Sequence, residues 1–343
     1  MSQKPQQPVL SGAVDPYESP YIRRNPDGSV NRIMSFPTTV ATPDADSPSP
    51  VLSKDILLNP NHATFLRIFI PRRAISSSSS SPSSSNLPLI VYFHGGGFVL
   101  LSASSSINHD FCSEMANQIP AVVVSVQYRL APEARLPAAY DDAVEALRWL
   151  KATDEKWIRE FSDVSRCYLV GTSAGGNMAY HVGLRLAAAV DEFGPMKIKG
   201  VILHHPFFSG SQRTESEVRL AINPTLPLSG SDLMWELALP EGADRDHEYC
   251  NPTVTHDWRT RFDEIGRLGW EILLAACDGD PMVDRQMELV KMLRSRGIKT
   301  VEHVGEGHHG MDLVDLSRAG PLFNLMRGFV CPSCGDFQSS SKF

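Results

Sequence analysis

The segment from Leu169 to Gly176 constrains the fold of this chain more than any other, because an apolar run leads straight into a Gly-x-Ser-x-Gly pentapeptide. Residues 167–170 predict a short buried strand, and the following segment, which contains Ala and Met, predicts a helix. The glycines at 171 and 175 allow a sharp turn between the two elements. Such a turn presents the Ser173 hydroxyl in the open, where a base can activate it. Ser173 is therefore the candidate nucleophile, although this pentapeptide also occurs in ordinary turns.

A second motif follows the apolar, aromatic run from Leu89 to Phe93, which predicts a strand that ends at His94-Gly95-Gly96-Gly97. Three successive glycines destabilise regular structure, so they need a reason. Without side chains, the N–H groups of Gly96 and Gly97 can approach a substrate oxygen closely. Together with the N–H of Ala174 they would bind the oxyanion of a tetrahedral intermediate, where each donor contributes about 3 kcal/mol. We expect His94 and Gly95 to support this loop, not to transfer protons.

Candidates for an acid and a base lie near the C-terminus, each after a predicted strand. The strand at 271–276 is followed by a loop with Asp278, Asp280 and Asp284, and the strand at 300–303 by a polar loop from Gly305 onward with His308 and His309. Sites on open parallel sheets lie at the carboxyl ends of the strands, where both loops fall. The acid would fix the tautomer of the base, and the base would take the proton of Ser173. Asp284 also fits the start of a helix, and Asp278 fits a side-chain hydrogen bond within the turn.

Several motifs taken together are shared with a known family: His94 to Gly97, Tyr128 to Glu133, Leu136 to Ala139, Gly171 to Asn177, Asp280 to Asp284, and His309-Gly310. With these motifs the chain resembles the hormone-sensitive-lipase group of the α/β-hydrolases, most of all the plant carboxylesterases, from about Asp15 to Val330. The resemblance implies an α/β fold with a mostly parallel central sheet, flanking helices and a helical cap.

The resemblance also separates the acid and base candidates. In that group the first Asp of Asp-Pro-x-x-Asp is the triad acid, which implies Asp280, and the family His precedes Gly, which implies His309. The doubled histidine, and Met311 where the family has Phe, keep His308 as a second candidate.

The function implied by the resemblance is hydrolysis of small to medium carboxylic esters through an acyl-serine, with no metal and no cofactor. Two alternatives use the same fold. The gibberellin receptor is similar and keeps the serine but lacks the catalytic histidine, and a further branch dehydrates hydroxyisoflavanones. The histidines at 308 and 309 favour a hydrolase over a receptor. A lipase that acts on membranes is a weaker alternative, since no segment predicts an exposed apolar docking helix.

Composition and charge exclude several other classes of protein. The 343 residues suffice for one large domain, and the net charge of −7 with scattered Lys and Arg argues against nucleic acid or an anionic membrane as partner. No apolar stretch reaches the ~18 residues that span a bilayer, and the first residues do not resemble a signal peptide.

The cysteines are spread along the chain, which favours a reducing, cytoplasmic location. Cys331 and Cys334 have the spacing of half a zinc site or of a redox pair, but the zinc site lacks its other half and the redox pair lacks a thioredoxin-like context. No carboxylate or cysteine lies at ligand spacing from His204-His205. The sequence leaves the oligomeric state open.

The organisation along the chain is predicted as one domain over residues 1–343 with four special segments. Residues 1–50 form an N-terminal tail, disordered to about Asp15, and part of the cap. The serine tract at 76–86 is a flexible loop. Residues 207–261 interrupt the strand–helix alternation and form the cap, and 331–343 are a disordered tail. The runs at 51–58 and 63–70 predict an antiparallel edge of the sheet, and we expect 16–37 to help roof the site.

Overall fold

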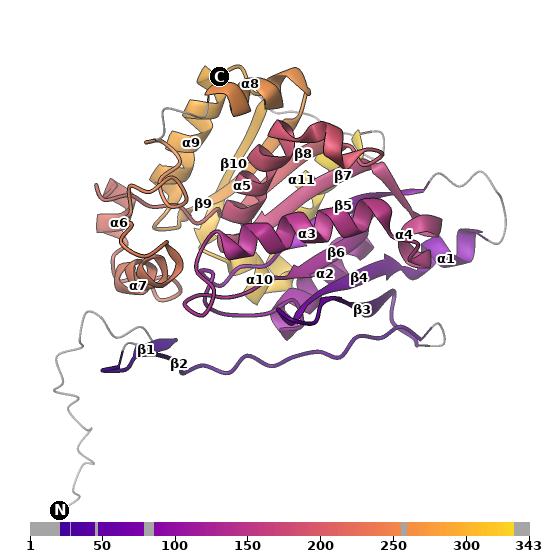
Figure 1. Ribbon diagram of the computed structural model, residues 1–343, viewed down its shortest axis with the longest axis horizontal. Helices are drawn as coiled ribbons and strands as arrows, with labels where there is room; N and C mark the ends of the chain where they lie inside the picture. The colour runs from indigo at the N-terminus through magenta and orange to yellow at the C-terminus, as the bar shows by residue number, and fades with distance from the viewer. Residues whose placement is uncertain (1–20, 28, 45–46, 79–85, 255–258, 333–343) are drawn as a thin grey trace, which may run out of the picture.

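An eight-stranded sheet forms the centre of the computed structural model, which describes residues 21–27, 29–44, 47–78, 86–254 and 259–332 (Figure 1). Its strands in chain order are β3 (Val51–Asn59), β4 (Thr64–Pro71), β5 (Leu87–Phe93), β6 (Val122–Gln127), β7 (Ser162–Thr172), β8 (Ile198–His204), β9 (Glu271–Gly279) and β10 (Thr300–His308). Their spatial order is β10-β9-β8-β7-β5-β6-β4-β3. Strands β10 to β6 are parallel, whereas β4 and β3 are antiparallel to their neighbours. The predicted mostly parallel sheet with an antiparallel edge is confirmed.

Helices cover both faces of the sheet, and a short hairpin precedes it. The helices are α1 (Arg72–Ser78), α2 (Ser106–Gln118), α3 (Ala138–Ala152), α4 (Lys156–Phe161), α5 (Ala174–Ala188), α6 (Glu215–Arg219), α7 (Leu228–Ala238), α8 (Arg259–Arg267), α9 (Val283–Ser295), α10 (Met311–Val314) and α11 (Gly320–Val330), with 3₁₀ turns η1 (Val190–Phe193) and η2 (Leu316–Arg318). The hairpin pairs β1 (Ile22–Arg24) with β2 (Val30–Arg32). In Figure 1, α3, α5 and α9 lie on the near face of the sheet and α2 and α11 on the far face.

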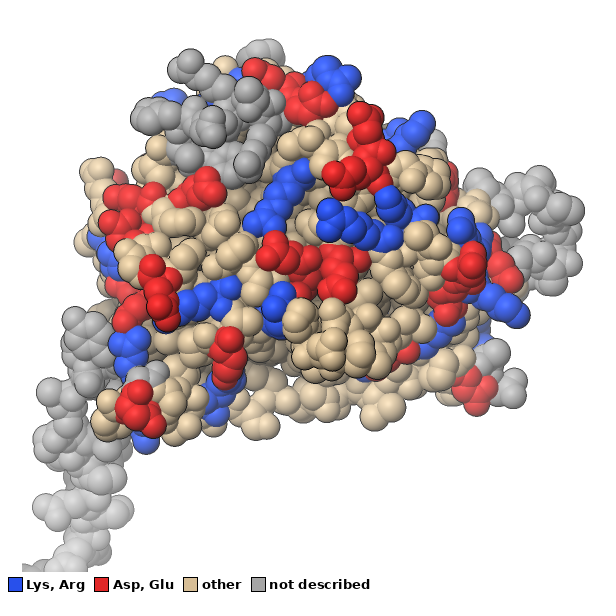
Figure 2. Space-filling view, in the orientation of Figure 1, with Lys and Arg blue, Asp and Glu red and all other residues tan. Residues whose placement is uncertain are grey.

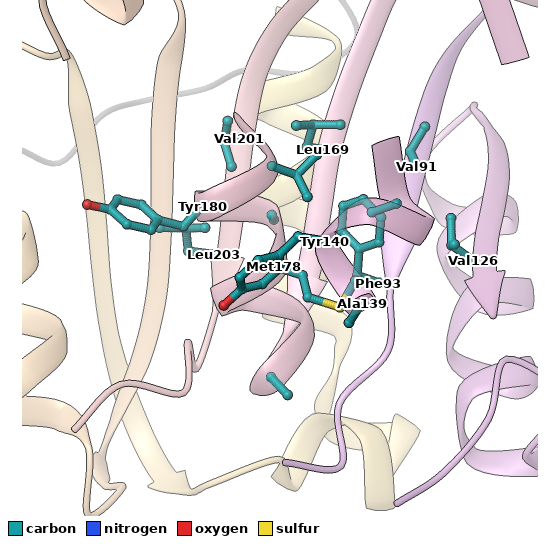
Figure 3. Packing of buried hydrophobic residues seen from close by; sticks show 14 of the residues in the cluster. Val91, Phe93, Val126, Ala139, Tyr140, Leu169, Met178, Tyr180, Val201 and Leu203 are labelled. Carbon is teal, nitrogen blue, oxygen red and sulfur yellow. The ribbon is translucent and has the colours of Figure 1, made fainter. Parts of the chain in front are cut away.

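The alternation of side chains along the strands divides the core into two layers. Val91, Phe93 and Leu169 belong to one apolar cluster, which the helices α3 and α5 complete with Tyr140 and Met178 (Figure 3). The residues between them in sequence point to the other face, where a second cluster packs against α2 and α11. Successive side chains of a strand alternate between faces, so strands covered on both sides are apolar throughout. The sheet is thus a rigid platform, whose strand ends carry the polar loops.

Two segments differ from the sequence prediction. Strand β10 continues through His308, so the polar loop predicted from Gly305 is wrong: these residues still pair with β9, with Gly305 opposite Cys277 and His308 opposite Gly279. The serine tract is also not wholly a loop, since residues 76–78 end α1, which packs on β4. Residues 79–85 and the predicted disordered ends 1–15 and 333–343 lie outside the described residues.

Candidate active site

The turn between β7 and α5 holds Ser173 in a conformation that few residues adopt. Its φ is 57° and its ψ is −118°, outside the favoured regions for a residue with a Cβ. The backbone is fixed there by hydrogen bonds, because the Ser173 N–H donates to the carbonyl of His204 at 2.9 Å and the Ser173 carbonyl accepts from Phe207 at 3.0 Å. Gly171 and Gly175 approach so closely that a Cβ on Gly171 would lie 1.9 Å from the Gly175 oxygen. The close approach explains the glycines of the pentapeptide.

Three side chains from distant parts of the chain meet at this turn. The Nε2 atom of His309 lies 2.9 Å from the Oγ atom of Ser173, and the Nδ1 atom of His309 lies 2.8 Å from Oδ2 of Asp280. All three are buried, Asp280 completely. Because Asp280 accepts the proton on Nδ1, Nε2 is left without one and accepts the hydrogen bond of the serine hydroxyl. This arrangement can deprotonate Ser173 when it attacks a carbonyl carbon.

The Asp280 carboxylate is held in its ionised form by its neighbours. Burial by itself would raise the pKa of Asp280, but His309 and His205 outweigh burial and hold this pKa well below its ordinary value. The Met282 N–H donates to Oδ1 at 2.9 Å, and the Nε2 group of Gln286 donates to Oδ2 at 3.0 Å. Asp280 therefore keeps its negative charge throughout the neutral pH range and can stabilise an imidazolium at His309.

The alternative acids and the alternative base have other contacts. Asp284 lies in the first turn of α9 and accepts a hydrogen bond from the Ser216 N–H at 2.6 Å. Asp278 accepts from the N–H of Gly307 at 3.2 Å. The Nδ1 atom of His308 faces the Oγ1 atom of Thr225 at 3.5 Å. Of these candidates, the structure brings only Asp280 and His309 into line with the serine.

The glycine loop after β5 lies directly against the nucleophile turn. A Cβ on Gly95 would be 3.3 Å from the Cβ of Ser173, and Gly96 and Gly97 have φ values of 111° and 61° that glycine adopts without strain. Ala174 starts α5, where the first N–H groups of a helix lack helical partners. The loop and the helix start thus put N–H groups beside the serine, as an oxyanion hole requires.

His94 is buried beneath this loop. Its Nδ1–H donates to the carbonyl of Gly95 at 2.8 Å, and its ring stacks on Tyr128 with the ring centroids 4.2 Å apart. Burial lowers the pKa of His94 to about 4, so the ring is neutral at neutral pH. The Tyr128 hydroxyl in turn donates to the His94 carbonyl at 2.8 Å. These contacts fix the start of the glycine loop.

A cavity of about 190 Å³ opens above Ser173 and His309. Tyr21 and Phe36 line it from the N-terminal segment, Leu226 and Met234 from the segment between β8 and β9, and Leu100 from the glycine loop. The wall side chains are thus apolar, so the cavity suits an uncharged organic group next to the carbonyl that Ser173 attacks.

Sequence reasoning missed the partners of Asp280 other than His309. His205 contacts Asp280 and Cys277, and both His204 and His205 lie near Asp312 of α10. No carboxylate or cysteine has ligand spacing from His204-His205 along the sequence, but the parallel sheet brings these residues together from distant parts of the chain. The donor atoms form two groups that a metal ion could use, His204-His205-Asp312 and His205-Cys277-Asp280, but they already contact one another and we assign no metal to them. The signal available in the sequence was the position of His205 at the carboxyl end of a strand.

Comparison with known proteins places this geometry in context. The profile of a family described as alpha/beta hydrolase fold matches residues 90–312. Carboxylesterase 20 of Arabidopsis thaliana is 48% identical, over 93% of this chain and 98% of its own length. A 3-O-acetylpapaveroxine carboxylesterase of Papaver somniferum is 45% identical, over 92% and 97%. The gibberellin receptor of Oryza sativa subsp. japonica matches over 59% of this chain. The solved hyperthermophilic esterase of Pyrobaculum calidifontis has a TM-score of 0.65 and 25% identity, over 83% of this chain and 84% of its own.

Proposed function

This chain belongs to the α/β-hydrolase family and is a carboxylesterase of the kind found in plants, and from that premise we propose that Ser173, His309 and Asp280 carry out the hydrolysis. The observation that supports these roles is the continuous line of hydrogen bonds from Ser173 Oγ through His309 to Asp280, with distances of 2.9 and 2.8 Å.

The reaction proceeds in two halves with the same groups. Ser173 attacks the ester carbonyl while His309 takes its proton, and His309 then passes the proton to the leaving alcohol. Water, activated by His309, attacks the resulting acyl-serine and releases the acid. In both halves the N–H groups of Gly96, Gly97 and Ala174 bind the oxyanion, and His94 and Gly95 keep the loop in place. The scheme needs no metal and no organic cofactor.

The substrates we propose are small to medium uncharged esters, which fit a cavity of about 190 Å³ with apolar walls. We assign the described residues within 207–261, and some of those within 1–50, to the cap over this cavity, because Met234 and Leu226 from the first segment and Tyr21 and Phe36 from the second line it. The partners are therefore small molecules. Lys and Arg are interspersed with Asp and Glu on the face shown in Figure 2, which does not favour a nucleic acid as partner.

The test of this function compares two serines of the same strand-and-turn segment. Purified protein should hydrolyse an aryl acetate, and an organophosphonate should label Ser173, as located by mass spectrometry of peptides. Ser173→Ala should lower kcat by ~10⁶ and abolish labelling. Ser165→Ala is the matched control, since that hydroxyl donates to Asp163 within a bend of β7. A Ser173→Ala variant within tenfold of the parent rate, or a label on another residue, contradicts the assignment.

Two other functions remain as outcomes of the same assay. A receptor would bind esters without consuming them, and the contact between His309 and Ser173 disfavours that function. A dehydratase would release water from a hydroxylated substrate without an acyl-serine, so the product and the acyl adduct distinguish it.

We further propose a cytoplasmic location. Among the described cysteines, Cys112, Cys167, Cys250 and Cys277 are buried with free thiols, and Cys331 is disulfide-bonded. The core thus holds only thiols, which a reducing compartment keeps stable. Within the described part of the chain, no helix is both long enough and apolar enough to cross a membrane. Fractionation of cells that express the tagged protein tests the location.

A further inference from the structure

The carboxylate of Asp280 has two imidazole partners, and the proposed reaction uses only one of them. Its Oδ2 atom lies 2.8 Å from Nδ1 of His309 and 3.1 Å from Nδ1 of His205. The centroids of the two imidazole rings are 5.5 Å apart. His205 is 2% exposed and is not among the residues that line the cavity above Ser173; it lines a second cavity of about 160 Å³ together with Asp312, Glu306 and Arg318. Any effect of His205 on the hydrolysis must therefore be exerted through Asp280.

The backbone holds His205 in place at some energetic cost. Residue 205 follows β8 with a φ of 45°, a left-handed conformation that a non-glycine residue rarely adopts. The His205 N–H donates to the carbonyl of Ala275 on β9 at 2.8 Å, and the carbonyl of His204 accepts from the N–H of Ser173. The same short segment thus supports the nucleophile turn and aims the His205 ring at Asp280.

A second carboxylate lies on the other side of the His205 ring. Asp312 Oδ2 is 3.8 Å from Nε2 of His205, and it accepts a hydrogen bond from Nε2 of His204 at 3.1 Å. The remaining titratable neighbour is Cys277, whose Sγ lies 3.7 Å from Nδ1 of His205. His205 therefore lies between two carboxylates, with two histidines and one thiol as its other titratable neighbours.

The two adjacent histidines differ in charge. Burial opposes a charge on His205, but the hydrogen bond with Asp280 and the nearby Asp312 carboxylate outweigh burial and raise the pKa of His205 well above its ordinary value. For His204 burial prevails and lowers the pKa to about 4. The Thr172 hydroxyl, which accepts from Tyr92, can donate to Nδ1 of His204 at 3.1 Å, which leaves the proton on Nε2 for Asp312. These surroundings thus favour the imidazolium form of His205 and the neutral form of His204.

We propose that His205 is a positioning residue for the hydrolysis, which holds the Asp280 carboxylate in line with His309 and offsets part of its negative charge. This inference rests on the proposed function. Without a second cation beside it, the Asp280 carboxylate would favour the protonated form of His309 more strongly, and a protonated ring cannot take the proton of Ser173. The ring centroid of His205 lies 5.5 Å from that of His309, so a positive charge on His205 disfavours the protonated form of His309. His309 can therefore act as a base at lower pH.

Three variants separate the hydrogen bond from the charge. His205→Asn keeps an N–H donor at the position of Nδ1 but loses the charge, His205→Phe loses both, and His204→Gln is the control at the adjacent buried histidine. We expect the acid limb of the pH profile of kcat/KM for an aryl acetate to move up by about one pH unit in both His205 variants, as two charges at this separation predict. The plateau rate should fall about tenfold only in His205→Phe. The His204→Gln profile should keep the acid limb of the parent.

An acid limb of His205→Asn that coincides with that of the parent overturns the proposal, because a residue that only supports the fold would lower the rate equally at every pH. A second measurement needs no variant: ¹⁵N NMR of the parent protein labelled at histidine should show one buried imidazole with protons on both ring nitrogens at pH 8. A neutral ring at His205 also overturns the proposal. If the parent does not hydrolyse esters, the proposed function fails, and the NMR measurement still tests the charge of His205.

Discussion

The side chain of Met234 on α7 occupies the space that a Cβ on Gly97 would need: that atom would lie 2.1 Å from the Met234 sulfur. The segment between β8 and β9 thus packs directly onto the loop that we propose binds the oxyanion. A residue with a Cβ is disfavoured at position 97 for two reasons, the contact with Met234 and the φ of 61°.

Gly97→Ala should therefore lower kcat by about 10²–10³, the effect of losing an oxyanion donor. Gly242→Ala is the matched control, because Gly242 has a φ of 79° and no atom within 4 Å of the added Cβ. Adding Met234→Ala to Gly97→Ala removes the two closest atoms, leaves only the Cβ of residue 234 at 3.1 Å, and should restore part of the rate. Steady-state kinetics measure the effect, and parent-like kcat in Gly97→Ala contradicts it.

Replacing His308 or His309 by alanine should have very different effects on kcat. His309→Ala removes the base that contacts Ser173 and should lower kcat by ~10⁶, whereas His308→Ala removes two weak contacts, with Thr225 and with the His309 carbonyl. Hydrolysis of an aryl acetate under saturating conditions provides the comparison. If His308→Ala is the inactive variant, the roles are exchanged.

Asp280→Asn should lower kcat by ~10⁴, because an amide cannot fix the tautomer of His309 in the same way. Asp284→Asn, four residues further along the chain, is the control. Asp284 lies in α9 and accepts a hydrogen bond from Ser216 of α6, so this variant should leave the rate close to that of the parent. Circular dichroism establishes that both variants fold. Equal losses in the two variants would remove the distinction between the carboxylates.

Asn177 should be a large contributor to stability. It is fully buried on α5, accepts from the Tyr140 hydroxyl at 2.7 Å and donates to the carbonyls of Phe207 and Tyr249. Asn177→Ala leaves these groups without their partner and should lower the free energy of unfolding by about 3 kcal/mol. Asn324→Ala, on the exposed side of α11, should change it by less than about 0.5 kcal/mol. Urea unfolding measures both.

Stability should fall as the pH falls from about 6.5 towards 4. Burial lowers the pKa values of His94 and His204 to about 4 in the folded protein, against 6.5 as the ordinary value, so the unfolded chain binds more protons in this window. Two such histidines predict a slope of about 2.7 kcal/mol per pH unit in the free energy of unfolding. His204→Gln should halve that slope, as measured by urea unfolding at a series of pH values. An unchanged slope would show that His204 is already protonated in the folded state.

Local sequence patterns were sufficient to predict most strands of the sheet. They were not sufficient to predict how far β10 extends or which distant side chains meet. Apolar runs located strands such as β5, β8 and β9, because buried parallel strands are apolar on both faces. The end of β10 could not be predicted, since Gly305 to His308 is polar and pairs only because β9 lies beside it. For the same reason the proximity of His205, Asp280 and Asp312 is a property of the strand order, which no local pattern contains. The choice of Asp280 among three aspartates came from resemblance, and its contact with His309 could be seen only in three dimensions.

The reacting side chains stand at the ends of strands, whereas Tyr21, Phe36, Leu226 and Met234 come from segments outside the large sheet. Substitutions at the cavity-lining positions can therefore alter which ester the enzyme accepts, while the residues that cleave the ester stay the same. A mutant library confined to Tyr21, Phe36 and Leu226 should yield enzymes that differ in preference yet share one chemistry, whereas Met234 also packs on Gly97.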